Sequence, residues 1–275
     1  ILLGSDNGGT VTPTDGSVTT AKIVDANVTK AKLADSVDIF AGTSLSAADL
    51  GSGIHIKTAD SGASVSGDAD ELVLENSRSG MTFLSATDNY GIINFGDSGD
   101  NNIGQILYYH GDNSLSFVNN AQTGLAISSI GAVTMPLQPA FSATRSATQS
   151  NLDINAGAQI VIAMATEIFD QNADYNTSTS TFTAPVTGKY QLNFYTYMAD
   201  VDDDFAYLQL DLVTSNRQYN TIIENVGSED GYDNISISVL ADMDASDTAV
   251  VKIQGSGGAD QLDLSQSGFS GYLAC

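Results

Sequence analysis

Two acidic stretches carry the residue types best suited to holding a metal ion. The first contains Asp200, Asp202, Asp203 and Asp204, which are the candidates for a calcium site. The second contains Glu229, Asp230, Tyr232 and Asp233, which are the candidates for a receptor-binding loop. Calcium takes six to eight oxygen ligands, and alternate carboxylates of one loop can supply several of them. Neither stretch has the spacing of a twelve-residue calcium hand. Two interpretations therefore stay open, a calcium site or a solvated loop that repels its neighbours, and calcium is the one cofactor that the residues suggest.

The sequence gives little support to catalysis. The two histidines lie far apart: His55 alternates with Ile54 and Ile56, which predicts an exposed strand residue, and His110 lies at a predicted turn. Phosphate-binding glycine loops, zinc-ligand spacings and a Ser-His-Asp order are not found in the sequence. The 33 acidic residues leave a glycosidase-type carboxylate pair open without locating it. We expect a protein that is not an enzyme.

The charge balance narrows the classes of partner. The 275 residues include 9 Lys and Arg against 33 Asp and Glu, which gives a net charge of -24. Such a surface repels nucleic acid and anionic lipid, so neither a nucleic-acid partner nor membrane insertion is expected. The single cysteine, Cys275, allows no disulfide within the chain, so stability must come from packing or assembly.

The pattern of the C-terminal half predicts half-buried antiparallel strands. Tyr190, Leu192 and Phe194 fall on one face of a strand, and Gln191, Asn193, Tyr195 and Tyr197 fall on the other. The same period of two places Leu208, Leu210 and Leu212 opposite Tyr207, Gln209 and Asp211. Together with 26 glycines, 4 prolines and no sustained helical periodicity, this alternation indicates an all-β chain.

The N-terminal half predicts structure that a single copy cannot complete. A ten-residue unit at 16–25 recurs at 26–35, a short strand is expected at Ile54–Lys57, and short strands with turns between them follow from Glu71 to Met135. Such short repeats and strands bury few apolar side chains by themselves. Several copies of the chain can bury more by covering the edges of each other's sheets. We therefore expect a parallel homotrimer with an N-terminal repeat or anchor segment at 1–45, a β-rich shaft at 46–136 and a head at 137–275.

Residues 91–135 resemble the shaft segments of bacteriophage tail fibres. The phrases that carry the resemblance are "INFGDSGDNNIGQILYYHGDNSLSF" and "ISSIGAV", and the Val-Thr-x-Ala-Lys-Ile/Leu repeat resembles fibre repeats as well. The resemblance implies a trimeric shaft of the β-prism or triple-β-helix type.

Residues 139–275 resemble the globular head of complement component one-q, a trimeric jelly roll of the tumour-necrosis-factor type. The motifs are Ala140-Phe141-Ser142-Ala143, Phe182-Thr183-Ala184-Pro185 with Gly188 and Tyr190, and Phe269-Ser270-Gly271-Tyr272-Leu273. The resemblance implies a jelly roll of about ten strands. It implies core or trimer-axis positions for Phe141, Phe182, Tyr190, Phe194, Phe269 and Tyr272.

These features together predict a bacteriophage virion fibre, located outside the cell, whose distal head attaches to the host surface. Its expected partners are two further copies of the chain, other virion proteins at the N-terminal end, and a host surface glycan or outer-membrane protein at the head. The alternatives are a fibre or decoration protein standing on the capsid and a polysaccharide-degrading tail spike.

Overall fold

A computed structural model describes residues 54–69, 71–154, 158–201, 205–224, 231–256 and 261–275. Every regular element in these ranges is a β-strand, so the all-β prediction is confirmed. No helix in the described ranges is long and apolar enough to cross a membrane. The repeat at 16–35 and the predicted segment 1–45 lie outside the described residues. The predicted domain boundaries stay predictions, and the chain divides into two compact units, Ile1–Thr82 and Phe83–Cys275.

The described part of the first unit holds one parallel pair of strands, β1 (Ile54–Lys57) and β2 (Leu72–Glu75). His55 was expected to be exposed, and this expectation is wrong. Its side chain is buried, with Nε2 2.9 Å from Glu75 Oε2. Glu75 also accepts a hydrogen bond from the Ser61 backbone N–H at 2.8 Å, which is the main reason that its pKa falls to about 2. The cross-strand acid thus turns His55 inward.

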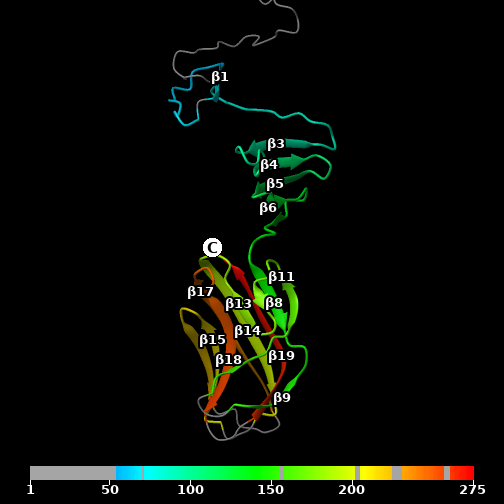
Figure 1. Cartoon of the computed structure of the whole chain (residues 1–275), viewed down its shortest axis with the longest axis vertical. Coiled ribbons are helices and arrows are strands. Elements are labelled where there is room, and N and C mark those ends of the chain that lie inside the picture. Colours follow the sequence, from blue (N-terminus) through cyan, green and yellow to red (C-terminus); the bar gives the residue numbers. More distant parts are fainter. Residues whose placement is uncertain (1–53, 70, 155–157, 202–204, 225–230, 257–260) are drawn as a thin grey trace, which may run out of the picture. The chain divides into compact units, whose positions relative to one another are not determined.

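The second unit begins with an antiparallel sheet in the order β3-β4-β5-β6-β7. Its strands are β3 (Tyr90–Phe95), β4 (Gly104–Tyr109), β5 (Ser114–Asn119), β6 (Gln122–Ile127) and β7 (Val133–Thr134). The turn between β5 and β6 has positive φ at Asn120 and Ala121, as a two-residue hairpin of strands with right-handed twist requires. Figure 1 shows β3 to β6 side by side in this order.

Two further sheets form the sandwich of the C-terminal half. The first has the order β11-β8-β19-β14-β17, and β9 also pairs with β19. Its strands are β8 (Ala140–Thr144), β9 (Gln149–Asp153), β11 (Thr166–Asp170), β14 (Gly188–Ala199), β17 (Tyr232–Met243) and β19 (Gln261–Leu273). The first strand of the sandwich thus lies beside the last, as Figure 1 shows for β8 and β19. We call this layer the β14 sheet.

The opposite layer has the order β12-β13-β18-β15-β16, and β10 pairs with β18. Its strands are β10 (Ile160–Val161), β12 (Tyr175–Asn176), β13 (Thr181–Thr183), β15 (Tyr207–Thr214), β16 (Gln218–Glu224) and β18 (Thr248–Ser256). The described chain has twelve elements from β8 to β19, and β10 and β12 are only two residues long. The other ten are longer strands. This architecture confirms the predicted jelly roll.

Aromatic rings fill the space between the two layers. The rings of Phe141 and Phe182 stack at 4.6 Å, and Phe269 meets Phe141 edge-on at 5.0 Å. Tyr190 and Phe194 project into the same core from β14. All five side chains are at most 2% exposed, and such aromatic pairs stabilise a core beyond the area that they bury. Tyr272 is instead 49% exposed, so only contact with another molecule could bury it.

The sandwich also buries the carboxylate of Asp211, although the alternation of side chains along β15 places it on the face opposite the core. Asp211 on β15 was expected on the polar face, yet its exposed fraction is 0%. Its two oxygens accept hydrogen bonds from the side-chain amides of Gln159, Gln209 and Gln218 at 3.0, 2.6 and 2.8 Å. These glutamines cover Asp211 from the solvent side and replace its water. The alternation was correct, but the conclusion about exposure was wrong.

Candidate functional site

The ends of the two predicted acidic stretches meet at one end of the β14–β17 pair. Ala199 pairs with Tyr232 and Met198 pairs with Asp233, so Asp200 follows β14 where β17 begins. Asp200 is exposed and Tyr232 is 72% exposed. Asp202, Asp203, Asp204, Glu229 and Asp230 lie outside the described residues. No group of three or more metal-binding side chains converges in the ranges that the structure covers, and calcium binding by these loops stays a prediction.

The solvent face of the β14 sheet carries an aromatic patch beside these loop ends. Tyr197 and Tyr232 stack with ring centroids 5.6 Å apart, and they are 39% and 72% exposed. Leu240 is 58% exposed on the same face of β17, but it lies eight residues farther along the strand, opposite Gln191. Exposed apolar groups on one face of a sheet are typical of a surface that another protein covers.

Farther along the same face, polar side chains interrupt the aromatic residues. The Gln191 amide donates to Asn193 Oδ1 at 3.1 Å and to Ser238 Oγ at 2.9 Å. Ser238 Oγ in turn donates to Asn193 Oδ1 at 2.8 Å. Gln191 Oε1 and the Asn193 amide nitrogen are not used within this network, so a partner that covers the face can bond to them. The face is therefore suited to a mixed polar and apolar contact.

A hollow of about 500 Å³ lies on the same sheet around Arg145. It is lined by residues Thr144 to Thr148, Tyr195 and Ser265 to Ser267. The chain forms it because β8 pairs with β19 only as far as Thr144, opposite Gly268, while β9 rejoins β19 at Gln149, opposite Leu264. Residues between these two pairings leave the sheet and uncover the middle of β19. We call this site the Arg145 hollow.

Arg145 reaches this hollow with part of its hydrogen-bonding capacity unused. Its Nη1 donates to the Ala163 carbonyl at 3.0 Å and its Nη2 to Gln149 Oε1 at 3.1 Å. Its Nε is buried without a hydrogen-bond partner, and no carboxylate of the described residues lies within ion-pair distance. Burial lowers the pKa of the guanidinium, because desolvation disfavours the charged form. The charge is thus partly desolvated and has no counter-ion.

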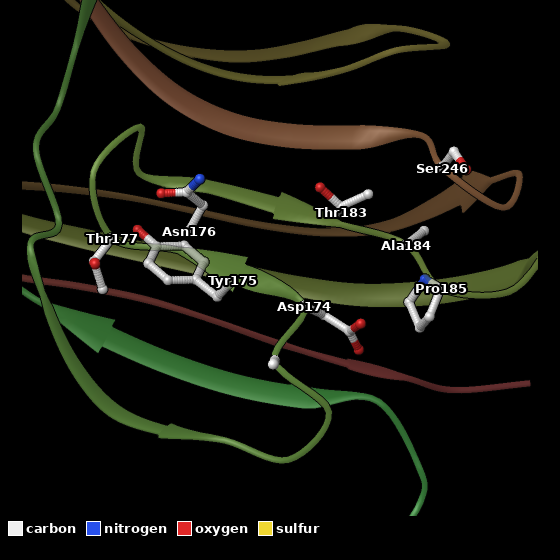
Figure 2. A pocket seen from close by; sticks show the side chains of 9 residues that line it. Asp174, Tyr175, Asn176, Thr177, Thr183, Ala184, Pro185 and Ser246 are labelled. Carbon is white, nitrogen blue, oxygen red and sulfur yellow. The ribbon is translucent and has the colours of Figure 1, made fainter.

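A second hollow, of about 550 Å³, contains the Asp174 carboxylate (Figure 2). Figure 2 shows Asp174 near Pro185, with Asn176 and Thr177 farther along the same segment. Asp174 Oδ2 and Asp170 Oδ1 are buried without hydrogen-bond partners. Burial raises the pKa of Asp174, and the charge of Asp170 raises it further, against a smaller opposing effect of Asn172. Because of its burial and, to a smaller extent, the neighbouring charge of Asp170, the Asp174 carboxyl group holds a proton more readily than an exposed one would.

Neither hollow was predicted from the sequence. In the sequence, Arg145 lies two residues after the Ala140-Phe141-Ser142-Ala143 motif, and Asp170 and Asp174 belong to none of the motifs named above. The scarcity of basic residues was the one available signal for Arg145, since an arginine in so acidic a chain would ordinarily find a carboxylate. Only the folded chain shows that it does not.

The architecture of the C-terminal half defines a class of domain, the two-layer antiparallel jelly roll. Residues 140–274 match the family model of the C1q domain. The chain therefore carries a C1q-type jelly roll in these residues, which confirms the resemblance of its C-terminal half to that family. No curated protein shows significant similarity to the chain. The resemblance of residues 91–135 to tail-fibre shafts stays a prediction.

Solved structures similar to the chain include three from different sources. The globular domain of the zebrafish complement 1qA protein is 19% identical, with a TM-score of 0.39, over 50% of this chain and 98% of that chain. Eiger TNF from S. frugiperda is 12% identical, with a TM-score of 0.36, over 50% and 92%. The PRD1 vertex protein P5 is 14% identical, with a TM-score of 0.34, over 49% and 96%.

Proposed function

We propose that the chain is a virion fibre protein of a bacteriophage, assembled as a homotrimer, whose C-terminal jelly roll attaches the virus to its host. The single observation that supports a homotrimer is the exposure of apolar side chains on both faces of the β3–β7 sheet. The shaft resemblance supports the viral setting, and the sheet face of the jelly roll supports contact between copies.

The β3–β7 sheet lacks a core of its own. Adjacent residues of one strand point to opposite faces, and the neighbours Ile92 and Ile93 on β3 are 39% and 37% exposed. Phe95 and Phe117 are 56% and 39% exposed, and Val118 is the one apolar side chain buried in the described residues of this sheet. A lone sheet that leaves this much apolar surface in water is stabilised when further copies cover it.

The jelly roll offers a second contact between copies. Proteins of the C1q and TNF families are typically homotrimers. The Tyr197–Tyr232 stack and Leu240 supply the exposed apolar part of such a contact, and the Gln191–Asn193–Ser238 network supplies its polar part. We assign this part of the β14 sheet to the interface between subunits.

Attachment by the jelly roll is supported by its order in the chain, after the β3–β7 sheet that we assign to the shaft. In a fibre held at its N-terminal end, the jelly roll then lies farther from the anchor than this sheet. Three copies present three equivalent sites, so modest affinity at each site suffices for firm adsorption through multivalency. The net charge of -24 keeps fibres apart from one another and disfavours unspecific contact with anionic surfaces.

Two alternatives keep the same assembly. A fibre on the capsid would differ only in where its N-terminal end docks, and labelling that end in virus particles distinguishes the two positions. A polysaccharide-degrading spike would need two carboxylates about 5 to 9.5 Å apart in a groove. Release of reducing sugar ends from host polysaccharide by the purified chain would favour the spike over the fibre.

The experiment on assembly compares the full chain with two charge variants. Ile93→Asp puts a charge on an apolar position of β3, and the control Gln122→Glu adds the same charge at an exposed polar position of β6. Sedimentation velocity should give a trimer for the parent and for Gln122→Glu, and smaller species for Ile93→Asp. A folded monomeric parent at micromolar concentration would refute the assembly.

Attachment is tested with the same full chain. Purified trimers should compete with virus particles for host cells and reduce adsorption in proportion to the sites that they occupy. A trimer that leaves adsorption unchanged at saturating concentration would refute the attachment function while leaving the assembly intact.

A further inference from the structure

We propose that the outer face of the layer formed by β10, β15, β16 and β18 binds a neutral polysaccharide of the host surface. This inference rests on the proposed attachment function and names the chemical class of the ligand. We call this face the amide face, because five amide side chains surround Asp211 on it: Gln159, Gln209, Gln218, Asn220 and Gln254.

The register of strand pairing brings these side chains to one face. Asp211 on β15 lies between Asn220 of β16 and Lys252 of β18. Gln209, two residues before Asp211, lies opposite Gln254 of β18, and Figure 1 shows β15 and β18 in the same layer. Residues directly opposite one another on paired strands share a face. The β14 sheet, which we assign to the contact between subunits, is the other layer of the sandwich, so that contact leaves the amide face open.

Asp211 fixes the orientation of three of the amides. Its carboxylate accepts hydrogen bonds from the side-chain nitrogens of Gln159, Gln209 and Gln218, and bonds to a charged acceptor are stronger than bonds between neutral groups. An amide that turns its nitrogen toward a carboxylate turns its carbonyl oxygen away from it. The carbonyl oxygen of Gln159 lies 3.5 Å from Lys252 Nζ. Those of Gln209 and Gln218 accept no hydrogen bond within the described residues, so they are oriented acceptors for a ligand.

Two further amides of the face are entirely unused. The side chains of Asn220, which is exposed, and Gln254, which is half-buried, make no hydrogen bond within the described part of the chain. An amide group both donates and accepts hydrogen bonds, and so does a hydroxyl group. A ligand with several hydroxyl groups can therefore use the nitrogens and the oxygens of these amides at the same time. A polysaccharide is such a ligand.

The charge of the face favours a neutral ligand. Asp211 and Glu224 are the acidic residues of β10, β15, β16 and β18, and Lys252 is their one basic residue, although the chain holds 33 acids. The Asp211 carboxylate is buried and bonded to amides, and Glu224 lies at the far end of β16, opposite Tyr207. An acidic polysaccharide would be repelled by the net charge of -24. A neutral one avoids this repulsion and still satisfies the amides.

Exposed apolar side chains flank the amides. Ile222 of β16 lies opposite Gln209 and is 50% exposed, and Val161 of β10 lies opposite Lys252 and is 39% exposed. A sugar ring carries C–H groups on its faces and hydroxyl groups at its edge, so it needs both kinds of partner. Four adjacent strands contribute side chains, and the face therefore extends over roughly 14 Å at the usual strand spacing. This width suits a polymer chain better than a single sugar.

The test measures binding of the full-length trimer to immobilised polysaccharides by surface plasmon resonance. The neutral probes are dextran, mannan and polygalacturonic acid whose carboxyl groups have been reduced to alcohols, and the acidic probe is unreduced polygalacturonic acid. We expect a neutral polymer to bind, and the acidic polymer to bind at least roughly tenfold more weakly than the best neutral one, because like charges repel. Binding of none of the neutral polymers, or equally tight binding of the acidic one, would overturn the proposal.

Variants with a matched control locate the site. Asn220→Leu and Gln254→Leu each remove an amide that makes no hydrogen bond within the described residues, so neither variant breaks a bond that the described fold uses. Each should weaken binding of the best neutral polymer roughly twofold to tenfold, since a neutral hydrogen bond contributes about that much, and the double variant should weaken it further. The control Gln122→Leu makes a similar exchange on β6 and should bind like the parent. Unchanged binding by the double variant would refute the amide face as the site.

The outcome separates this proposal from attachment itself. Trimers that compete with virus for cells but bind no neutral polymer would refute the polysaccharide site and keep the attachment function. Trimers that bind a neutral polymer through Asn220 and Gln254 but do not compete would refute attachment and keep the site.

Discussion

The β3–β7 sheet and the jelly roll are both antiparallel, yet the first exposes most of its apolar side chains and the second buries them. In the described strands of the sheet, Val118 is the one buried apolar side chain. In the jelly roll, alternate residues from Tyr190 to Met198 in β14 and from Leu208 to Leu212 in β15 are at most 2% exposed. A second layer explains the difference, since a sheet can hide an apolar face only against another element. The jelly roll contains its own second layer, and we propose that the β3–β7 sheet obtains one from other copies.

The largest loss of stability should come from removing an aromatic ring from the core of the jelly roll. Phe182→Ala removes a ring with 0% exposure that stacks on Phe141 at 4.6 Å. The loss should be about 3 to 5 kcal/mol in the free energy of unfolding, measured by guanidinium denaturation. The control Phe169→Ala removes a ring that is 48% exposed and should cost much less. Equal losses would mean that the jelly roll does not fold around Phe182.

The second prediction uses dilution, which should affect the two regions differently. We expect other copies to complete the β3–β7 sheet, so dilution should favour dissociated chains. Because one trimer yields three chains, each tenfold dilution displaces the dissociation equilibrium of the trimer about a hundredfold toward the chains. Amide exchange followed by mass spectrometry should speed up in β3 to β6 on dilution and stay nearly constant in β15. Exchange that is independent of concentration in β3 to β6 would show that the sheet is stable alone.

A smaller effect is expected at the buried carboxylate of the jelly roll. Asp211→Ala removes the acceptor of Gln159, Gln209 and Gln218 and leaves their amides without partners. A hydrogen bond to a charged group contributes about 1.5 to 3 kcal/mol, but Gln159 and Gln218 are exposed and can bond to water instead, so we expect a total loss of about 1 to 3 kcal/mol. Asp211→Asn keeps one acceptor oxygen and should lose less. A more stable Asp211→Ala variant in thermal melts would show that burial of the charge outweighs its bonds.

The smallest effect concerns pH. The pKa of Asp174 is raised in the folded chain by burial and by Asp170, so the folded state binds a proton more readily than the unfolded state. Stability from this group is therefore present at low pH and decreases as pH rises through the folded pKa. Asp174→Asn should raise the melting temperature at pH 7 and have little effect at pH 3.

Asp242 is the opposite case and serves as the control for the pH experiment. Its pKa is lowered to about 2, chiefly by hydrogen bonds from Arg217. Its contribution is present above the unfolded pKa and is lost as pH falls toward 2. Asp242→Asn should therefore lower the melting temperature at pH 7, by little, because the pair is exposed. Shifts of the same sign in both variants would contradict this assignment.

The sequence by itself determined the class of the fold and the inward face of the main strands. Alternation placed Tyr190, Leu192 and Phe194 on one side of β14, and the structure buries all three. Such a pattern is local, because neighbouring residues of a strand point to opposite faces whatever surrounds them. The motifs around Phe141, Phe182 and Phe269 likewise indicate the jelly roll, through their resemblance to the C1q family.

Only the tertiary structure decided which polar residues are covered and where hollows form. Glutamines from β15, β16 and the segment before β10 cover Asp211, and Glu75 draws His55 inward. The Arg145 hollow exists because β8 and β9 leave β19 uncovered between them. Each of these features joins residues that are distant in sequence, and pairing register decides whether they meet. A period of two carries no information about register between strands, so these features emerge only when the strands are paired.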